Sequence, residues 1–249
     1  MEREVRYCTT EDGVRLAYTV AGEGYPLVRS VGWATHVEYD LAKPLWRYML
    51  EPLTERFQLV LYDGRGTGLS DRHVEEHSLE QWVTDLEAVV NAIGLKRFAL
   101  LGISQGGSTT IDYSTRHADL VSHLILYGSF ARANNSNPRS RELYESLVTM
   151  ARVGWGQNHP TFRQVFTAMF IPRATVDQQQ MFDEMQRLSM NAEEVVALLR
   201  AISTLDVREL LPRVTVPTLV LHRREDQVAP FRRGRELAAG IPGARFVPL

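Results

Sequence analysis

The stretch that decides the fold is FALLGISQGG, residues 98–107. Its first four residues are apolar and predict a buried strand. They lead into the pattern G-x-S-x-G, in which Ser104 stands between the small residues Gly102 and Gly106. Glycines at these positions let a strand turn sharply into a helix, so that the serine hydroxyl is exposed at the tip of the turn. The sequence therefore predicts a strand–turn–helix unit with a serine at its apex.

A serine in this position has the surroundings that a nucleophile needs. The N-terminus of the following helix points backbone N–H groups toward the same place and stabilises negative charge there. A chance match of five residues is the alternative interpretation. The apolar run before the motif and the helix after it are, however, the context that the motif requires. We therefore predict that Ser104 is a nucleophile.

The rest of the chain alternates apolar runs with amphipathic stretches, the pattern of strands and crossover helices in a parallel sheet. An opening hairpin is expected around the turn Asp12-Gly13. The clearest helix begins after Ser78, which forms a capping box with Gln81, and stops at Gly94. Further strands are expected at 27–31, 58–62, 122–127, 218–221 and from 246, and further helices at 44–56, 106–117 and 232–239. The expected fold class is α/β.

Residues 132–211 differ in character from the rest of the chain. Four helix-like stretches occur here without an intervening strand, at 140–153, 161–170, 175–188 and 192–205. The simplest arrangement is a helical cap, 132–211, inserted into an α/β core formed by residues 1–131 and 212–249. Five of the seven methionines lie in this segment. Flexible thioethers suit a pocket for apolar ligands, but they also fill irregular cores, which is the interpretation we prefer.

Composition and charge limit the classes of protein to consider. A chain of 249 residues, 44% of them hydrophobic, can bury one substantial core. With a net charge of -2, the chain lacks the excess of positive charge that is typical of proteins that bind nucleic acid or an anionic membrane surface. Cys8 stands alone, and the first residues lack the apolar stretch of a signal peptide. We expect a cytoplasmic protein that acts on a small molecule and could form a homodimer.

A second motif makes the chain similar to a known family. Residues 63–71, DGRGTGLSD, resemble the D-x-R-G-x-G-x-S motif that follows the fourth strand in many α/β-hydrolases. With the Ser104 motif, the resemblance covers essentially the whole chain. It implies the α/β-hydrolase fold and a cofactor-free serine hydrolase of the esterase type. More narrowly, residues 32–33, 36–40 and 101–106 resemble hydrolase-type domains that occur in bacteria beside or fused to nucleotide cyclases and helix-turn-helix regulators.

The resemblance also implies an acid after the strand at 218–221. The family pattern there is D-x-V-x-P, and residues 226–230, DQVAP, match it. A carboxylate at this place would hold an imidazole in one tautomer and stabilise its protonated form. Asp226 is the expected acid. Its neighbour Glu225 would serve if the register of the loop slipped.

An oxyanion hole with two backbone donors is implied as well. One donor would be the N–H of Gln105, and the other would come from the loop at 30–33, where Trp33 has the right position. The family commonly has His-Gly where this chain has Val31-Gly32. The ring of Trp33 can at the same time be a core aromatic, because the donor is backbone. His36, in the same loop, is expected to contact the substrate.

The general base is missing from the place that the resemblance implies. In the family this histidine follows the last strand, and none of the seven histidines here lies beyond Asp226. One interpretation is that the chain is part of a longer protein, and we prefer it because ending inside a core strand would leave an exposed edge. The other is a sensor domain whose pocket binds a small ligand without chemistry. His222 and His123 fall inside strands and are expected to be structural.

Two further patterns have simpler explanations than a bound metal or cofactor. Residues 73–77, HVEEH, fit the H-x-x-E-H pattern of zinc peptidases, but they precede the helix cap at Ser78 and so share no helix face. The glycines of 64–68 lack the third glycine of a dinucleotide fingerprint. No metal and no cofactor is expected. The chain is predicted to hydrolyse carboxylic ester or lactone bonds through an acyl-enzyme.

Overall fold

The computed structural model describes residues 4–43, 45–72, 74, 77–133 and 137–249. Within these ranges one eight-stranded sheet has the order β1-β2-β4-β3-β5-β6-β7-β8. The strands are β1 (Arg6–Thr9), β2 (Arg15–Ala21), β3 (Tyr25–Arg29), β4 (Phe57–Tyr62), β5 (Phe98–Ile103), β6 (Val121–Tyr127), β7 (Thr218–His222) and β8 (Arg245–Pro248). The helices are α1 (Val37–Ala42), α2 (Arg47–Thr54), α3 (Leu79–Ile93), α4 (Gly106–Arg116), α5 (Pro138–Gly154), α6 (Thr161–Phe170), α7 (Val176–Ser189), α8 (Ala192–Ser203), the 3-10 helix η1 (Arg208–Arg213) and α9 (Arg232–Gly240).

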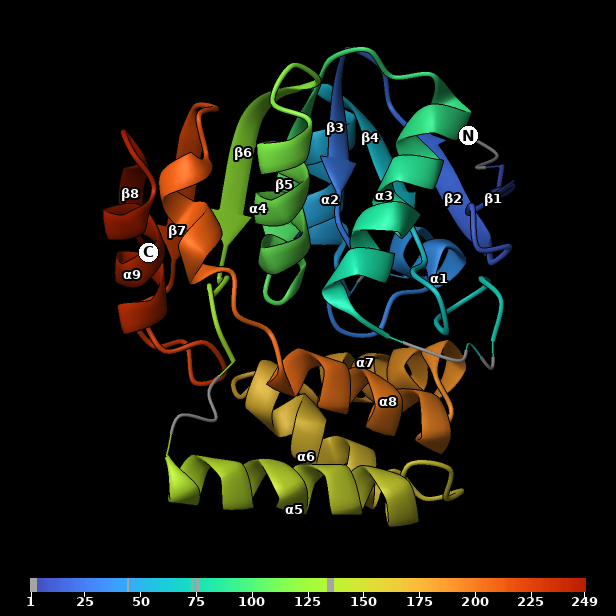
Figure 1. Cartoon of the computed structure of the whole chain (residues 1–249). Helices are drawn as coiled ribbons and strands as arrows, with labels where there is room; N and C mark the ends of the chain where they lie inside the picture. The colour runs from blue at the N-terminus through green and yellow to red at the C-terminus, as the bar shows by residue number, and fades with distance from the viewer. Residues whose placement is uncertain (1–3, 44, 73, 75–76, 134–136) are drawn as a thin grey trace.

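The direction of the strands indicates the edge of the sheet at which a ligand site is expected. β2 pairs antiparallel with β1 and β4, and the strands from β3 to β8 pair parallel to their neighbours. The carboxyl ends of the parallel strands therefore meet at one edge of the sheet, which faces the layer of helices α5–α8 (Figure 1). Open α/β sheets bind their ligands outside this edge. The loops that follow β3, β5, β6 and β7 are accordingly the place to look for a site.

Two apolar cores hold helices against the sheet. On one face, α3 contributes Leu86 to a core that also contains Leu100 of β5 and Val220 of β7, all of them fully buried. On the other face, Leu50 of α2 packs with Leu59 of β4. Crossover helices bury one apolar stripe each, as the amphipathic pattern of the sequence predicts. The predicted α/β-hydrolase fold is confirmed.

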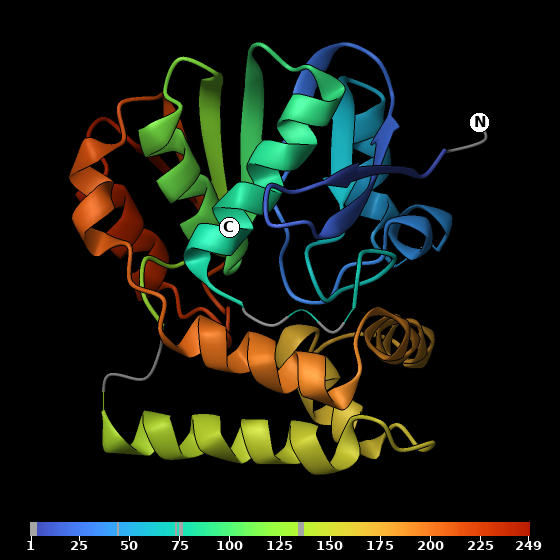
Figure 2. The ribbon, with the colours of Figure 1, turned by 45° about the vertical axis from the view of Figure 1, so that its right-hand side comes forward.

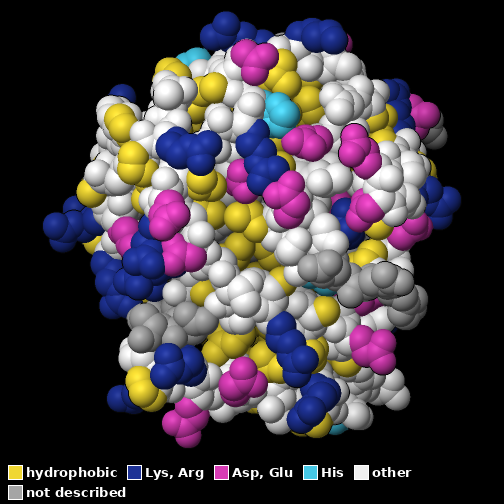
Figure 3. All heavy atoms as spheres, in the orientation of Figure 1, with side chains coloured by type: hydrophobic (Ala, Val, Ile, Leu, Met, Phe, Trp, Pro, Cys, Tyr) yellow, Lys and Arg dark blue, Asp and Glu magenta, His cyan; other side chains and the backbone are white. Residues whose placement is uncertain are grey.

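The helices α5–α8 form a separate layer, which we call the cap (Figure 2). Their buried apolar side chains form one cluster that also contains Ala34, Tyr39 and Leu45 of the sheet layer, and we call this cluster the cap core. The chain enters and leaves this layer through adjacent segments. Arg132 and Asp206 form an isolated antiparallel β-bridge through their backbones, and the Ala133 N–H donates to the Leu205 carbonyl (2.9 Å). Apolar side chains show on the surface where the cap meets the sheet layer, whereas charged side chains of both signs are scattered over the same face (Figure 3). Within the described ranges, no helix combines the length and the apolar character needed to cross a membrane.

Most predicted elements are present within a few residues of their expected ends. Ser78 caps α3 by accepting the Gln81 N–H (3.3 Å), and Gly94 ends the helix at φ +74°. The helix expected at 44–56 is shorter and is preceded by α1, which the sequence analysis does not predict. The reason is local: α1 is capped by the imidazole of His36, which accepts the Tyr39 N–H (3.4 Å), and histidine is not a usual N-cap residue.

Candidate active site

Ser104 lies at the turn between β5 and α4 in a strained conformation. Its φ is +55°, the left-handed region that few residues other than glycine adopt. The Ser104 N–H donates to the Tyr127 carbonyl (3.1 Å), and the Ser104 carbonyl accepts the Gly107 N–H (3.1 Å). These two bonds hold the turn, and such strain persists only where the surrounding structure fixes it. The predicted sharp turn with a serine at its tip is therefore present, and the side chain is half-buried.

The glycines of the motif are required by close packing. A Cβ on Gly102 would lie 2.4 Å from the Thr110 hydroxyl, and a Cβ on Gly106 would lie 2.5 Å from the Val31 carbonyl oxygen. Side chains cannot be accommodated at such distances without movement of the backbone. The second contact also shows that the segment 30–33 lies directly against the start of α4.

This contact brings the two predicted oxyanion donors into neighbouring segments. Gln105 is the first residue of the turn into α4, and Trp33 ends the segment that packs on Gly106. The Ser30 N–H bonds to the Leu101 carbonyl (2.9 Å), so the segment continues the pairing of β3 with β5. The ring of Trp33 belongs to the cap core, where it stacks on Phe170 at 5.2 Å.

Asp226 lies in the loop after β7, at the same edge of the sheet. Its Oδ1 accepts the N–H groups of Val228 (3.0 Å) and Ala229 (2.8 Å), which fixes the carboxylate. Its Oδ2 faces Gly128, where a Cβ would lie 3.3 Å away. The Asp226 side chain is 22% exposed, whereas that of Glu225 is 71% exposed and pairs with Arg173. Of the two candidate acids, only Asp226 is turned toward the neighbouring strand end.

One strand separates Ser104 from Asp226. The Ser104 N–H bonds to Tyr127 at the end of β6, and the next residue, Gly128, donates to the Leu221 carbonyl of β7 (3.0 Å). Neighbouring strands are about 4.8 Å apart, so β5 and β7 lie about 10 Å apart at this edge. Ser104 and Asp226 therefore lie at the same edge of the sheet, with the end of β6 between them.

In the described ranges no imidazole is hydrogen-bonded to Ser104 or Asp226. His222 is fully buried, and its Nε2 lies 2.6 Å from the Ala229 carbonyl and 3.9 Å from Asp226 Oδ2. A Cβ on Gly234 of α9 would lie 2.6 Å from His222 Nδ1, so the ring packs on that helix. The expectation that His222 points into the structure is confirmed. His36 caps α1, and burial lowers its pKa; its predicted contact with substrate stays a prediction.

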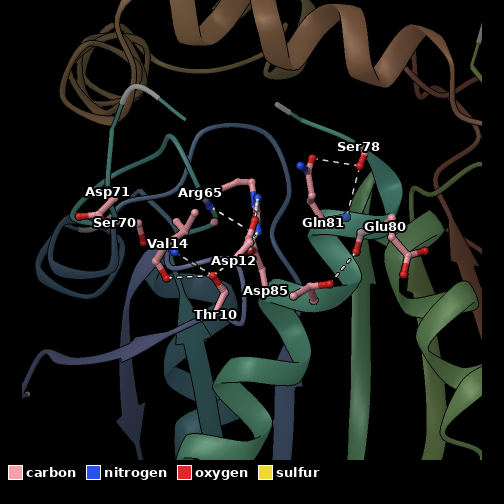
Figure 4. Close-up of polar contacts among 12 residues, drawn as sticks. Thr10, Asp12, Val14, Arg65, Ser70, Asp71, Ser78, Glu80, Gln81 and Asp85 are labelled. Carbon is pink, nitrogen blue, oxygen red and sulfur yellow. Dashed lines mark hydrogen bonds and ion pairs between the residues drawn. The ribbon is translucent and has the colours of Figure 1, made fainter. Parts of the chain in front are cut away.

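The motif at 63–71 holds the loop after β4 in place. Arg65 is buried between two carboxylates, Asp85 (2.7 Å) and the partly exposed Asp12 (2.7 Å) (Figure 4). Asp63 is fully buried and accepts the N–H groups of Val37 and Leu69 (2.9 Å). Burial raises the pKa of Asp63 to about 7. The motif thus ties α1, α3 and the first hairpin to the carboxyl edge of the sheet.

A small cavity is lined in part by residues 30–32. Its volume is about 20 Å³, enough for about one water molecule. Gln105 Nε2 is buried without a hydrogen-bond partner among the described residues, and its side chain lines the cavity.

Most of the zinc-like pattern at 73–77 falls on residues 73, 75 and 76, which lie outside the described residues. His77 is described, and its ring packs against the loop at Gly66. Burial lowers the pKa of His77 to about 4, so its imidazole is neutral at pH 7.

Comparison with known proteins finds hydrolases of similar sequence and structure. A family profile described as Serine aminopeptidase, S33 matches residues 52–246. An AB hydrolase superfamily protein, YisY, of Bacillus subtilis (strain 168) is 29% identical, over 97% of this chain and 89% of its own length. An esterase (EaEST) from Exiguobacterium antarcticum superposes with a TM-score of 0.84 at 25% identity, over 97% of this chain and 89% of its own. The enol-lactonase from Burkholderia xenovorans LB400 superposes with a TM-score of 0.80 at 25% identity, over 98% of this chain and 91% of its own.

Proposed function

Since the chain belongs to the serine aminopeptidase S33 family of α/β-hydrolases and is a hydrolase of that type, we propose that it cleaves carboxylic ester or lactone bonds through an acyl-enzyme on Ser104. The observation that carries the proposal is the strained turn, which holds Ser104 at φ +55° at the carboxyl edge of the sheet. The fixed carboxylate of Asp226, two strands away, supports it.

The proposed reaction has two halves. The Ser104 hydroxyl attacks the substrate carbonyl, and its proton passes to a general-base imidazole oriented by Asp226, a group that none of the described histidines supplies in this structure. The N–H groups of Gln105 and Trp33 stabilise the oxyanion, and the imidazolium then protonates the leaving alkoxide. Water, deprotonated by the same imidazole, attacks the acyl group and releases the acid from Ser104. No cofactor takes part in these steps.

The substrate class rests on the cap and on the similar structures. The ring of Trp33, whose N–H is the proposed second donor, stacks on Phe166 and Phe170 of the cap. Aromatic side chains favour a small apolar acyl group over a charged one. An esterase and an enol-lactonase are among the proteins of similar structure, which supports an ester or a lactone as the bond that is cleaved.

The test is intact-mass analysis before and after treatment with a fluorophosphonate probe. A single adduct is expected on the protein and on Ser146→Ala, a control on the exposed part of α5, and no adduct on Ser104→Ala. Hydrolysis of p-nitrophenyl esters should disappear in the same variant. An adduct that persists in Ser104→Ala, or a folded protein that forms none, would contradict the proposal.

A second candidate is a sensor domain of a signalling or regulatory protein. The observation that favours it is that His222, the imidazole beside Asp226, bonds to the Ala229 carbonyl instead (2.6 Å). A domain of this kind would bind a small ligand and leave it intact. Stabilisation by an ester or lactone without turnover would support it, whereas turnover that depends on Ser104 would exclude it.

A further inference from the structure

A chain of buried polar groups links the ring of Trp33 to a carboxylate of the cap. Trp33 Nε1 donates to Gln186 Oε1 (3.1 Å), and Gln186 Nε2 donates to Thr167 Oγ1 (2.9 Å). The Thr167 hydroxyl in turn donates to Asp183. Gln186 is fully buried, and Thr167 and Asp183 are almost so. Satisfied polar networks in such surroundings make a structure rigid.

The chemistry of the two ends fixes the direction of this chain. An indole N–H can only donate, so Gln186 must turn its carbonyl oxygen toward Trp33 and its NH₂ toward Thr167. The Thr167 oxygen then accepts from Gln186, and its proton points to Asp183. No member can rotate without leaving a buried polar group unpaired, which costs more than one hydrogen bond contributes.

The same ring is clamped by aromatic side chains of the cap. It stacks on Phe166 at 5.6 Å and 11° and on Phe170 at 5.2 Å and 30°, while Trp155 meets it edge-on at 6.0 Å. The residue that follows Trp33 is Ala34, whose φ is +24°. A residue with a Cβ holds such a conformation only where its neighbours impose it. The backbone around the Trp33 peptide is therefore strained and held from the cap side.

We propose that Gln186 is a positioning residue that acts through Trp33 on the oxyanion hole. The inference rests on the proposed function, because it uses the Trp33 N–H as an oxyanion donor. Through its bond to the indole, Gln186 sets the orientation of the Trp33 side chain and, with it, the peptide that presents the donor. Without this bond the Trp33 N–H is held less firmly in the oxyanion hole. Stabilisation of the transition state is then reduced more than substrate binding.

The test compares Gln186→Met with Gln180→Met, the same change at an exposed position of α7. With a p-nitrophenyl ester, Gln186→Met should lower kcat about tenfold and change KM by less than about twofold, as expected for one lost hydrogen bond in the transition state. The affinity for phenylboronic acid, which forms a tetrahedral adduct on serine, should fall by the same factor as kcat. Gln180→Met should match the wild type.

A double-mutant cycle shows whether Gln186 acts through Trp33. Trp33→Phe keeps the backbone N–H and an aromatic ring but removes the indole donor. If both residues act through one bond, the double variant should be no worse than the poorer single variant. Full additivity, or a change in KM alone, would overturn the proposal.

Amide hydrogen exchange separates this inference from the proposed function. Residues 30–36 should exchange faster in Gln186→Met than in Gln180→Met, whether or not the protein turns over a substrate. If the wild-type protein forms no adduct with the fluorophosphonate probe, the hydrolase proposal is refuted. The comparison of exchange rates between the two variants still tests the positioning role. Equal exchange in the two variants would overturn the positioning role.

Discussion

The Nε2 of His222 lies 2.6 Å from the Ala229 carbonyl oxygen but 3.9 Å from Oδ2 of Asp226. A carbonyl only accepts, so Nε2 carries the proton and donates a hydrogen bond to the Ala229 carbonyl. The Asp226 carboxylate meanwhile accepts two N–H groups of its own loop through Oδ1. Its other oxygen faces the neighbouring strand end, as required of an acid that orients an imidazole there.

Asp226→Asn is therefore expected to lower kcat about a thousandfold or more, because an amide would favour the wrong tautomer of the imidazole. The change keeps an oxygen for the Val228 and Ala229 N–H groups, so the loop should survive. Glu225→Gln is the matched control, since this neighbouring side chain is 71% exposed and should leave kcat within about twofold. Equal losses in the two variants, measured as p-nitrophenyl ester hydrolysis, would refute the assignment of the acid.

Ser104→Gly and Ser104→Ala should differ in stability although both lack the nucleophile. Glycine adopts φ +55° without the steric cost that any Cβ carries, so Ser104→Gly is expected to be more stable than Ser104→Ala by about 1 kcal/mol. Urea unfolding of the two variants measures the difference. An alanine variant as stable as the glycine variant would mean that the turn is not strained in solution.

The serine turn could be predicted from sequence because its determinants are local. Gly102, Ser104 and Gly106 lie within five residues, and Ser78 and Gly94 mark the ends of α3 in the same way. The loop pattern beginning at Asp226 was equally local. The family resemblance then supplied the expected role of each position.

The contacts that join distant segments could not be predicted. Gln186 meets Trp33 across 153 positions, and nothing in the sequence around either residue indicates the bond. The ion pair of Arg65 with Asp85 spans 20 positions and depends on how α3 packs beside the loop. The sequence predicted the loop at 63–71 but not that its arginine would be buried between two carboxylates.

Asp63 should make stability depend on pH in an unusual direction. Burial raises its pKa from 3.8 to about 7, so the folded protein binds this proton more tightly than the unfolded chain does. Between about pH 4 and pH 7 this group therefore lowers the free energy of unfolding as pH rises, by at most about 1.4 kcal/mol per unit, and it has no further effect above that range.

The measurement is the difference in unfolding free energy between wild type and Asp63→Asn from pH 4 to pH 8. Wild type should lose stability relative to the variant as pH rises to about 7. Asp206→Asn is the flat control over this range, because pairing with Arg208 lowers the pKa of Asp206 below 3.8. Its contribution to stability is fully present above about pH 4 and is lost only as pH falls below that value. A flat difference for Asp63→Asn would show that the carboxyl titrates normally.

The two carboxylates that flank Arg65 should differ in what their removal costs. Asp85 is buried with Arg65, so Asp85→Ala leaves a guanidinium in the interior without its buried partner and is expected to cost about 3 kcal/mol. The Asp12 side chain is 45% exposed, and Asp12→Ala should cost less, about 1 kcal/mol, because the guanidinium keeps its buried partner Asp85. Chemical denaturation of the two variants gives both values. A cost for Asp12→Ala equal to that for Asp85→Ala would mean that the hairpin at residues 6–21, rather than α3, holds the loop that carries Arg65.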